Sequence, residues 1–174
     1  MTPTLDEIRR LCRDCAARFP NPDAAADLLL GTAAQESNFV YRRQIGFAPD
    51  SQRGAFGLWQ VEQGSMKSSL SLLNRKPELL AASFAFLVAY PNNLCALLSS
   101  YNVASIANIM RYEMGDPMAC LFARLHYLRV RAPIPGDLAG QAVYWKLYYN
   151  TVKGKGTAGQ YLDNWRRLCG TQSV

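Results

Sequence analysis

Ala34-Gln35-Glu36-Ser37-Asn38-Phe39 is the stretch of sequence on which the predicted fold and the predicted function both depend. It closes a pattern that begins at Pro22 and repeats at helical spacing through Ala25, Leu28, Leu29 and Thr32. A carboxylate placed where a buried helix opens into a loop is partly removed from water, and this raises its pKa. Glu36 is therefore predicted to be a general acid that keeps its proton near neutral pH. A Glu at a helix end, taken alone, is more often an ordinary surface residue.

A second motif follows further along the chain, Gly54-Ala55-Phe56-Gly57-Leu58-Trp59-Gln60. Its glycines, Gly54 and Gly57, allow a tight turn and a close approach of the backbone to a ligand. Gln60 carries an amide that can both donate to and accept from sugar hydroxyls and acetamide groups. Trp59 has two interpretations of equal weight, a platform that stacks on a sugar ring and an anchor of the hydrophobic core.

Glu36-Ser37-Asn38-Phe39 followed by Gly57-Leu58-Trp59-Gln60 resembles the paired motifs of the lysozyme-like lytic transglycosylases and the related goose-type lysozymes. Those motifs read Glu-Ser-x-Phe and Gly-Leu-Met-Gln, so Trp59 stands where Met is usual. The third motif of the family is Ala-Tyr-Asn-Ala-Gly. Its nearest match is Ser100-Tyr101-Asn102-Val103-Ala104, which lacks the closing Gly, and the resemblance covers about residues 20–110.

The resemblance implies a mainly helical, lysozyme-like fold with a small loop or β-hairpin wing beside the active-site cleft. It implies that Glu36 protonates the glycosidic oxygen between N-acetylmuramic acid and N-acetylglucosamine in peptidoglycan. The same carboxylate would then take a proton from the muramic acid C6 hydroxyl, which closes a 1,6-anhydro ring. In the family the third-motif Tyr orients the acid, a role that falls to Tyr101, with Tyr149-Asn150 as a rival. The implied substrate site is completed by Ser37, Gly57, Trp59, Gln60 and Asn102.

The sequence leaves open whether the cleavage is hydrolysis or ring closure. If Asp50 or Glu62 holds a water molecule across the cleft, hydrolysis replaces ring closure. Asp50 belongs to the segment 41–54, which is predicted to be a loop or short hairpin, while Glu62 has an alternative as an exposed helix residue. Neither route implies a metal ion or an organic cofactor.

The cysteines do not indicate a metal site. Cys12-x-x-Cys15 is the one closely spaced pair among the five cysteines, it lies in a predicted helix, and no second pair follows. The single histidine, His126, is distant in sequence, whereas a structural zinc ion normally has four ligands. Cys12 and Cys15 are therefore predicted to be free, buried thiols, and His126 to be a packed or half-exposed helix residue.

Length and composition indicate one globular domain over residues 1–174. The chain has 174 residues, of which 49% are hydrophobic and 18% charged, which is enough for a single substantial core. Helical patterns cover residues 5–19, 22–35, 66–73, 77–90, 92–101, 117–129, 137–149 and 158–168. The motif-bearing core is therefore followed by a C-terminal helical extension at residues 133–174.

The net charge of +6 favours an anionic partner such as a cell wall. The basic residues are spread along the chain with no long basic run and no nucleic-acid motif, so specific nucleic-acid binding is not predicted. No apolar run reaches the length that crosses a bilayer. The N-terminal segment 1–7 carries acid where a secretory signal carries base and an apolar core, so the protein is expected to be made in a cytoplasm.

The segment 144–151 concentrates four aromatic residues, Tyr144, Trp145, Tyr148 and Tyr149. It resembles the C-terminal end of small phage and prophage proteins, and it is expected either to pack inward or to dock other virion proteins. The combined prediction is a bacteriophage virion-associated enzyme that opens peptidoglycan locally at the host periplasm or cell wall. The alternative is a structural tail, neck or spike component that keeps the fold without activity. A helical DNA-binding protein is a third possibility and rests on charge alone.

Overall fold

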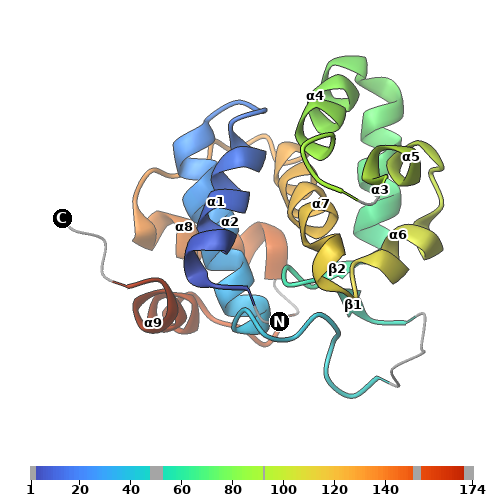
Figure 1. The fold of residues 1–174 in the computed structure, drawn as a ribbon. Coiled ribbons are helices and arrows are strands. Elements are labelled where there is room, and N and C mark those ends of the chain that lie inside the picture. The colour runs from blue at the N-terminus through green and yellow to red at the C-terminus, as the bar shows by residue number, and fades with distance from the viewer. Residues whose placement is uncertain (1–2, 48–52, 92, 151–153, 171–174) are drawn as a thin grey trace.

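The computed structural model describes residues 3–47, 53–91, 93–150 and 154–170, and the fold is mainly helical, as predicted (Figure 1). Its α-helices are α1 (Leu5–Ala16), α2 (Pro22–Ser37), α3 (Gln63–Arg75), α4 (Pro77–Leu87), α5 (Leu94–Ser99), α6 (Val103–Ile109), α7 (Asp116–Leu128), α8 (Leu138–Trp145) and α9 (Ala158–Cys169). A 3-10 turn, η1 (Glu113–Gly115), precedes α7, and a π-helical turn, η2 (Lys146–Asn150), continues α8. The finer arrangement, a lysozyme-like one, stays a prediction.

Two groups of helices flank α7. Figure 1 shows α1, α2, α8 and α9 on one side of α7 and α3 to α6 on the other, and α7 contacts α1 and α2 as well as α3 and α4. One hydrophobic core runs through both groups and includes Ile8 on α1 and Phe86 on α4. None of the described helices is long and apolar enough to span a membrane.

Helix α2 carries much of this core. Its buried residues are Ala25, Ala26, Leu28, Leu29, Leu30, Gly31, Thr32, Ala33, Ala34 and Ser37. Gly31 has a specific role, because a Cβ at this position would overlap the Tyr161 side chain of α9. The small residues of α2 thus let neighbouring helices approach closely. This close packing fixes the position of α2, and with it the position of the residues at its C-terminal end.

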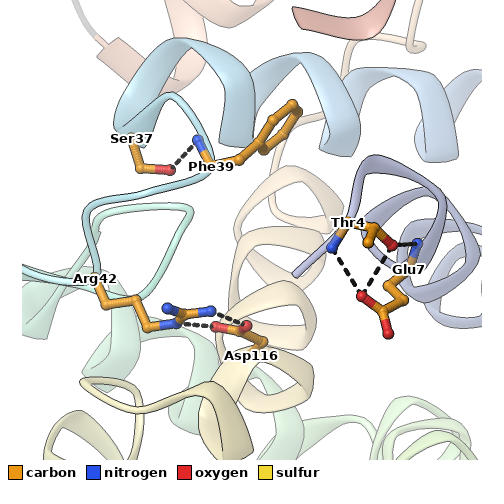
Figure 2. A network of polar contacts seen from close by, with 6 residues as sticks. All are labelled: Thr4, Glu7, Ser37, Phe39, Arg42 and Asp116. Carbon is orange, nitrogen blue, oxygen red and sulfur yellow. Dashed lines mark hydrogen bonds and ion pairs between the residues drawn. The ribbon is translucent and has the colours of Figure 1, made fainter. Parts of the chain in front are cut away.

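The C-terminal end of α2 is sharply defined. Asn38 and Phe39 both have left-handed backbone conformations, with φ of 52° and 60°. The Ser37 hydroxyl donates to the Ala33 carbonyl and accepts from the Phe39 N–H, and Figure 2 shows the second of these bonds. The chain therefore turns away immediately after Glu36 and Ser37.

The β-structure in the described residues is one short hairpin. Strand β1 (Ala55–Phe56) pairs antiparallel with β2 (Val61–Glu62), and Arg43 adds an isolated bridge to Phe56. The described part of segment 41–54, which was predicted to be a loop or a short hairpin, forms a loop beside this hairpin. Both strands come after this segment in the sequence. Between them the chain reverses direction through left-handed backbone at Gly57 and Gln60, with φ of 73° and 46°. Asp50 lies outside the described residues.

Several predicted helix boundaries are confirmed by their caps. Thr4 and Thr157 form capping boxes with Glu7 and Gln160, the first of which appears in Figure 2. Helix α6, whose N-cap is Asn102, was not predicted from the sequence, and neither was the π-helical turn after Trp145.

All five cysteines are free thiols, and Cys12 and Cys15 are buried. The described residues contain no group of three or more His, Cys, Asp or Glu side chains placed to hold a metal ion.

A buried ion pair fixes the loop that follows α2. Arg42 donates from Nε and Nη2 to the two carboxylate oxygens of Asp116 on α7, at 2.9 and 2.7 Å (Figure 2). The two side chains are only 12% and 9% exposed. The Arg42 carbonyl also accepts from the Gly57 N–H at 3.0 Å, so the same residue holds the turn of the hairpin.

Arg42→Ala is expected to lower the free energy of unfolding by about 3–5 kcal/mol, because it leaves the Asp116 carboxylate buried without its partner. The matched control is Arg166→Ala, which breaks the ion pair with Asp163, whose side chains are 63% and 77% exposed. That control should change stability by less than about 1 kcal/mol. Urea unfolding at neutral pH measures both, and equal effects would show that the Arg42 pair is not the stronger constraint.

Candidate active site

Glu36 opens onto a cavity of about 450 Å³ at the end of α2. The cavity lies between the loop after α2, the hairpin, α3, α7 and the π-helical turn. Its lining residues are Glu36, Tyr41, Arg43, Gln44, Ile45, Ala55, Gln60, Val61, Glu62, Ser65, His126, Tyr149, Asn150 and Gly154. Of the predicted site residues, the structure therefore brings Glu36 and Gln60 to one cavity, together with the rival pair Tyr149-Asn150.

The surroundings of Glu36 favour its protonated form. Burial raises the pKa of Glu36 to about 7, and the negative charge of Glu62 acts in the same direction. Against these effects, the buried indole of Trp145 donates from Nε1 to Glu36 Oε1 at 3.0 Å and stabilises the carboxylate. At neutral pH both protonation states are thus accessible, which is the property that a proton donor and acceptor requires.

Gln60 is held in place by its own amide nitrogen. Nε2 donates to the Tyr41 carbonyl at 3.0 Å and to the Gly57 carbonyl at 2.9 Å. Its side-chain oxygen accepts no hydrogen bond from the described part of the chain, so it can accept from a ligand hydroxyl or amide in the cavity. Gln60 thus lines the same cavity as Glu36.

Tyr149 lines the cavity, whereas Tyr101 does not. Tyr149 donates from its hydroxyl to the Trp59 carbonyl at 2.6 Å, and its pKa is raised by burial and by the nearby charge of Glu36. Tyr101 is 37% exposed between α5 and α6 and does not line the cavity, and Asn102 accepts from the Ser105 N–H as the cap of α6. The site roles predicted for Tyr101 and Asn102 are corrected accordingly, and the Tyr-Asn pair at the cavity is Tyr149-Asn150.

Three further predicted substrate contacts have structural roles instead. Trp59 is fully buried and donates from its indole nitrogen to the Leu29 carbonyl at 2.8 Å, so it is a core anchor. Ser37 is 2% exposed and its hydroxyl is used at the end of α2. Gly57 is buried against α7, where a Cβ would overlap the Ala119 side chain. None of the three lines the cavity.

The aromatic segment packs largely inward. Trp145 is fully buried, and Tyr144 is 4% exposed with its hydroxyl donating to the Ala132 carbonyl at 2.9 Å. Tyr149 lines the cavity, which leaves Tyr148 as the exposed aromatic of the four, at 37%. The predicted docking surface formed by all four residues is therefore wrong, because Tyr144 and Trp145 are buried in the core and cannot contact a partner protein.

Three side chains at or beside this cavity were not predicted to belong to the site. Trp145 reaches Glu36 across 109 positions of sequence, and no local pattern could show that contact. Ser65 and His126 meet at 2.8 Å. His126 is a half-buried residue of helix α7, as predicted, but its contact with Ser65 was not. Glu62, which was predicted either to hold a water molecule across the cleft or to be an exposed helix residue, is exposed at the end of β2 and lines the cavity.

Comparison with known protein families, with curated proteins and with solved structures gives no match to this chain. The function proposed below therefore rests on the residues of the cavity and on the motifs that the sequence carries.

Trp145→Phe is expected to raise the pKa of Glu36 above its value of about 7, because it removes the donor that stabilises the carboxylate. A ¹³C NMR titration of the Glu carboxyl carbons measures the shift. Trp165→Phe is the matched control, since Trp165 is buried and its indole nitrogen has no hydrogen-bond partner in the described structure. An unchanged midpoint in Trp145→Phe would show that the indole does not control the acid.

Glu36→Gln is expected to stabilise the fold at pH 8 and not at pH 4. The folded-state pKa of about 7 lies above the ordinary value of 4.5, so the stability linked to protonated Glu36 is present below pH 4.5 and lost as the pH rises through 7. The difference amounts to something on the order of 3 kcal/mol. Urea unfolding of both proteins across this range measures it, and a pH-independent difference would contradict the raised pKa.

Proposed function

We propose that this protein cleaves peptidoglycan glycan strands at the bond between N-acetylmuramic acid and N-acetylglucosamine, as a muramidase or a lytic transglycosylase. One observation carries the proposal. Glu36, the acid of the sequence motif, lies at a cavity of about 450 Å³ with a pKa of about 7. A cavity of that size is typical of sites for small ligands and can admit sugar units.

The first chemical step uses the protonated form of Glu36. Its carboxyl group donates a proton to the glycosidic oxygen as the bond breaks, and positive charge develops on the sugar ring. Glu62 lines the same cavity, and its carboxylate stabilises that developing charge. Trp145 donates a hydrogen bond to the carboxylate of Glu36 that is left behind, so it favours the state that follows proton transfer.

The second step uses Glu36 as a base, and the atom that loses the proton decides the product. Proton removal from the C6 hydroxyl closes a 1,6-anhydro ring, whereas removal from water gives hydrolysis. Glu62 is a carboxylate that could hold that water, which keeps the hydrolytic route in the proposal. Gln60 and Asn150 line the cavity and offer amide groups to the hydroxyl and acetamide groups of the sugars.

The cellular setting proposed for this activity comes from the sequence alone. Association with a phage virion and delivery to the host wall stay predictions, as does the alternative of an inactive structural component. The site supports the enzymatic proposal over that alternative, because the acid and the cavity beside it are both present.

Glu36→Gln is expected to reduce the release of soluble fragments from purified sacculi by at least about 100-fold, since the amide has no proton to transfer. Glu78→Gln is the matched control, because Glu78 is a surface residue 64% exposed in a pair with Lys76, and it should retain the wild-type rate. Equal release by wild type and Glu36→Gln would remove Glu36 from the mechanism. Mass spectrometry of the fragments separates the two routes, since anhydro products are lighter by one water.

The rate of fragment release is expected to fall as the pH rises through about 7, because Glu36 then loses the proton that the first step needs. Initial rates from pH 5 to pH 9 at constant ionic strength measure this limb. A rate that stays flat to pH 9 would contradict a proton donor with this pKa.

A further inference from the structure

A second group of reactive side chains lines the same cavity. Ser65 on α3 and His126 on α7 meet at 2.8 Å between Oγ and Nδ1, and both line the cavity with Glu36. The proton donor and acceptor roles described above do not use either residue. Both side chains are only partly buried, so a ligand in the cavity can reach them.

The hydrogen bonds of His126 determine which ring nitrogen is the base. Nε2 lies 2.7 Å from the Tyr148 carbonyl oxygen, and a carbonyl can only accept, so Nε2 carries the proton. In the neutral ring Nδ1 is then unprotonated and accepts from the Ser65 hydroxyl. Burial lowers the pKa of His126, which keeps the ring neutral at pH 7. The carbonyl thus orients the ring and the ring faces the serine, as in a nucleophile activated by an adjacent base.

Ser65 also stands where negative charge can be stabilised. It is in the first turn of α3, directly after strand β2, and the N-cap residue Glu62 makes no side-chain cap bond. The first N–H groups of a helix have no partner within the helix and attract an oxyanion. Arg129 Nη1 lies 3.4 Å from Ser65 Oγ and adds positive charge. Gly64 presents no side chain, and the space where a Cβ would lie is open.

We propose that Ser65 and His126 form a nucleophile and base that hydrolyse short acyl esters of sugar hydroxyls in this cavity. Ser65 Oγ forms a bond to the acyl carbon while its proton moves to His126 Nδ1. The bond from the acyl carbon to the sugar oxygen breaks, and that oxygen takes the proton from Nδ1. Water then attacks the acyl carbon and gives a proton to His126 Nδ1. The bond from the acyl carbon to Ser65 Oγ breaks, Oγ takes that proton from Nδ1, and the carboxylic acid leaves, which restores the Ser65 hydroxyl and the neutral ring.

The choice of a sugar ester as substrate rests on the proposed function. Ring closure by Glu36 requires a free C6 hydroxyl, and an acyl ester at that oxygen leaves no proton to remove. A serine and an acid in one cavity would let the protein remove such an ester and then cleave the strand beside it.

A fluorophosphonate probe tests the serine without any sugar. Wild-type protein is expected to gain one phosphonyl adduct, which peptide mapping by mass spectrometry places on Ser65. Ser65→Ala should abolish it, and Ser68→Ala, which removes an exposed hydroxyl that donates to the Gly64 carbonyl on the same helix, should not. No adduct on the wild type, or an adduct on another residue, would overturn the proposal.

Hydrolysis of p-nitrophenyl acetate provides the second measurement. Ser65→Ala is expected to lower its rate by at least about 100-fold, and His126→Gln to slow it similarly. Circular dichroism shows whether each variant is folded. If His126→Gln is not folded, the fluorophosphonate adduct on Ser65 of the wild-type protein tests the proposal instead. Equal rates in wild type and Ser65→Ala would overturn the proposal. Because neither probe contains a glycosidic bond, these results are independent of whether the protein cleaves sacculi.

Discussion

The desolvated carboxyl group of Glu36 is the constraint on which the site depends. Helix α2 is buried over most of its length, and it ends at Ser37, one residue after Glu36, so the Glu36 side chain has a fixed position beside the cavity. Burial raises its pKa to about 7, whereas the indole of Trp145 keeps the ionised form within reach. Because the two effects oppose each other, the group can both release and accept a proton near neutral pH.

A chain of hydrogen bonds to backbone carbonyls holds the rest of the cavity in register with α2. Trp59 donates to the Leu29 carbonyl within α2, and the Trp59 carbonyl accepts in turn from Tyr149. Segments distant in sequence are thereby tied to one helix through buried groups, whose hydrogen bonds must be satisfied. On the other side, Arg42 links the loop after α2 to Asp116 at the start of α7. The floor and walls of the cavity are therefore fixed relative to the acid.

The sequence predicted the residues that local pattern controls and missed those that tertiary packing controls. Glu36 and Gln60 were placed at one site because the two short motifs that contain them resemble paired motifs of one enzyme family. Trp59 was predicted either to stack on a sugar ring or to anchor the core. The structure shows the core anchor, because the indole is buried and its N–H donates to the Leu29 carbonyl of α2. Tyr101 was preferred to Tyr149 as the tyrosine of the site because it lies nearer in sequence to the first two motifs, although Tyr149 is also followed by an Asn. The contact from Trp145 to Glu36 depends on how α8 packs on α2, which no short pattern encodes.

The most direct test of the central claim is a crystal structure of Glu36→Gln with a peptidoglycan tetrasaccharide, in which cleavage is blocked and the sugar can remain bound. The account predicts sugar units in the cavity of about 450 Å³, in contact with Gln60 and Tyr149. It also predicts a glycosidic oxygen about 2.6–3.2 Å from the substituted side chain. A saccharide bound outside this cavity, or bound in it with every glycosidic oxygen beyond reach of that side chain, would contradict the account.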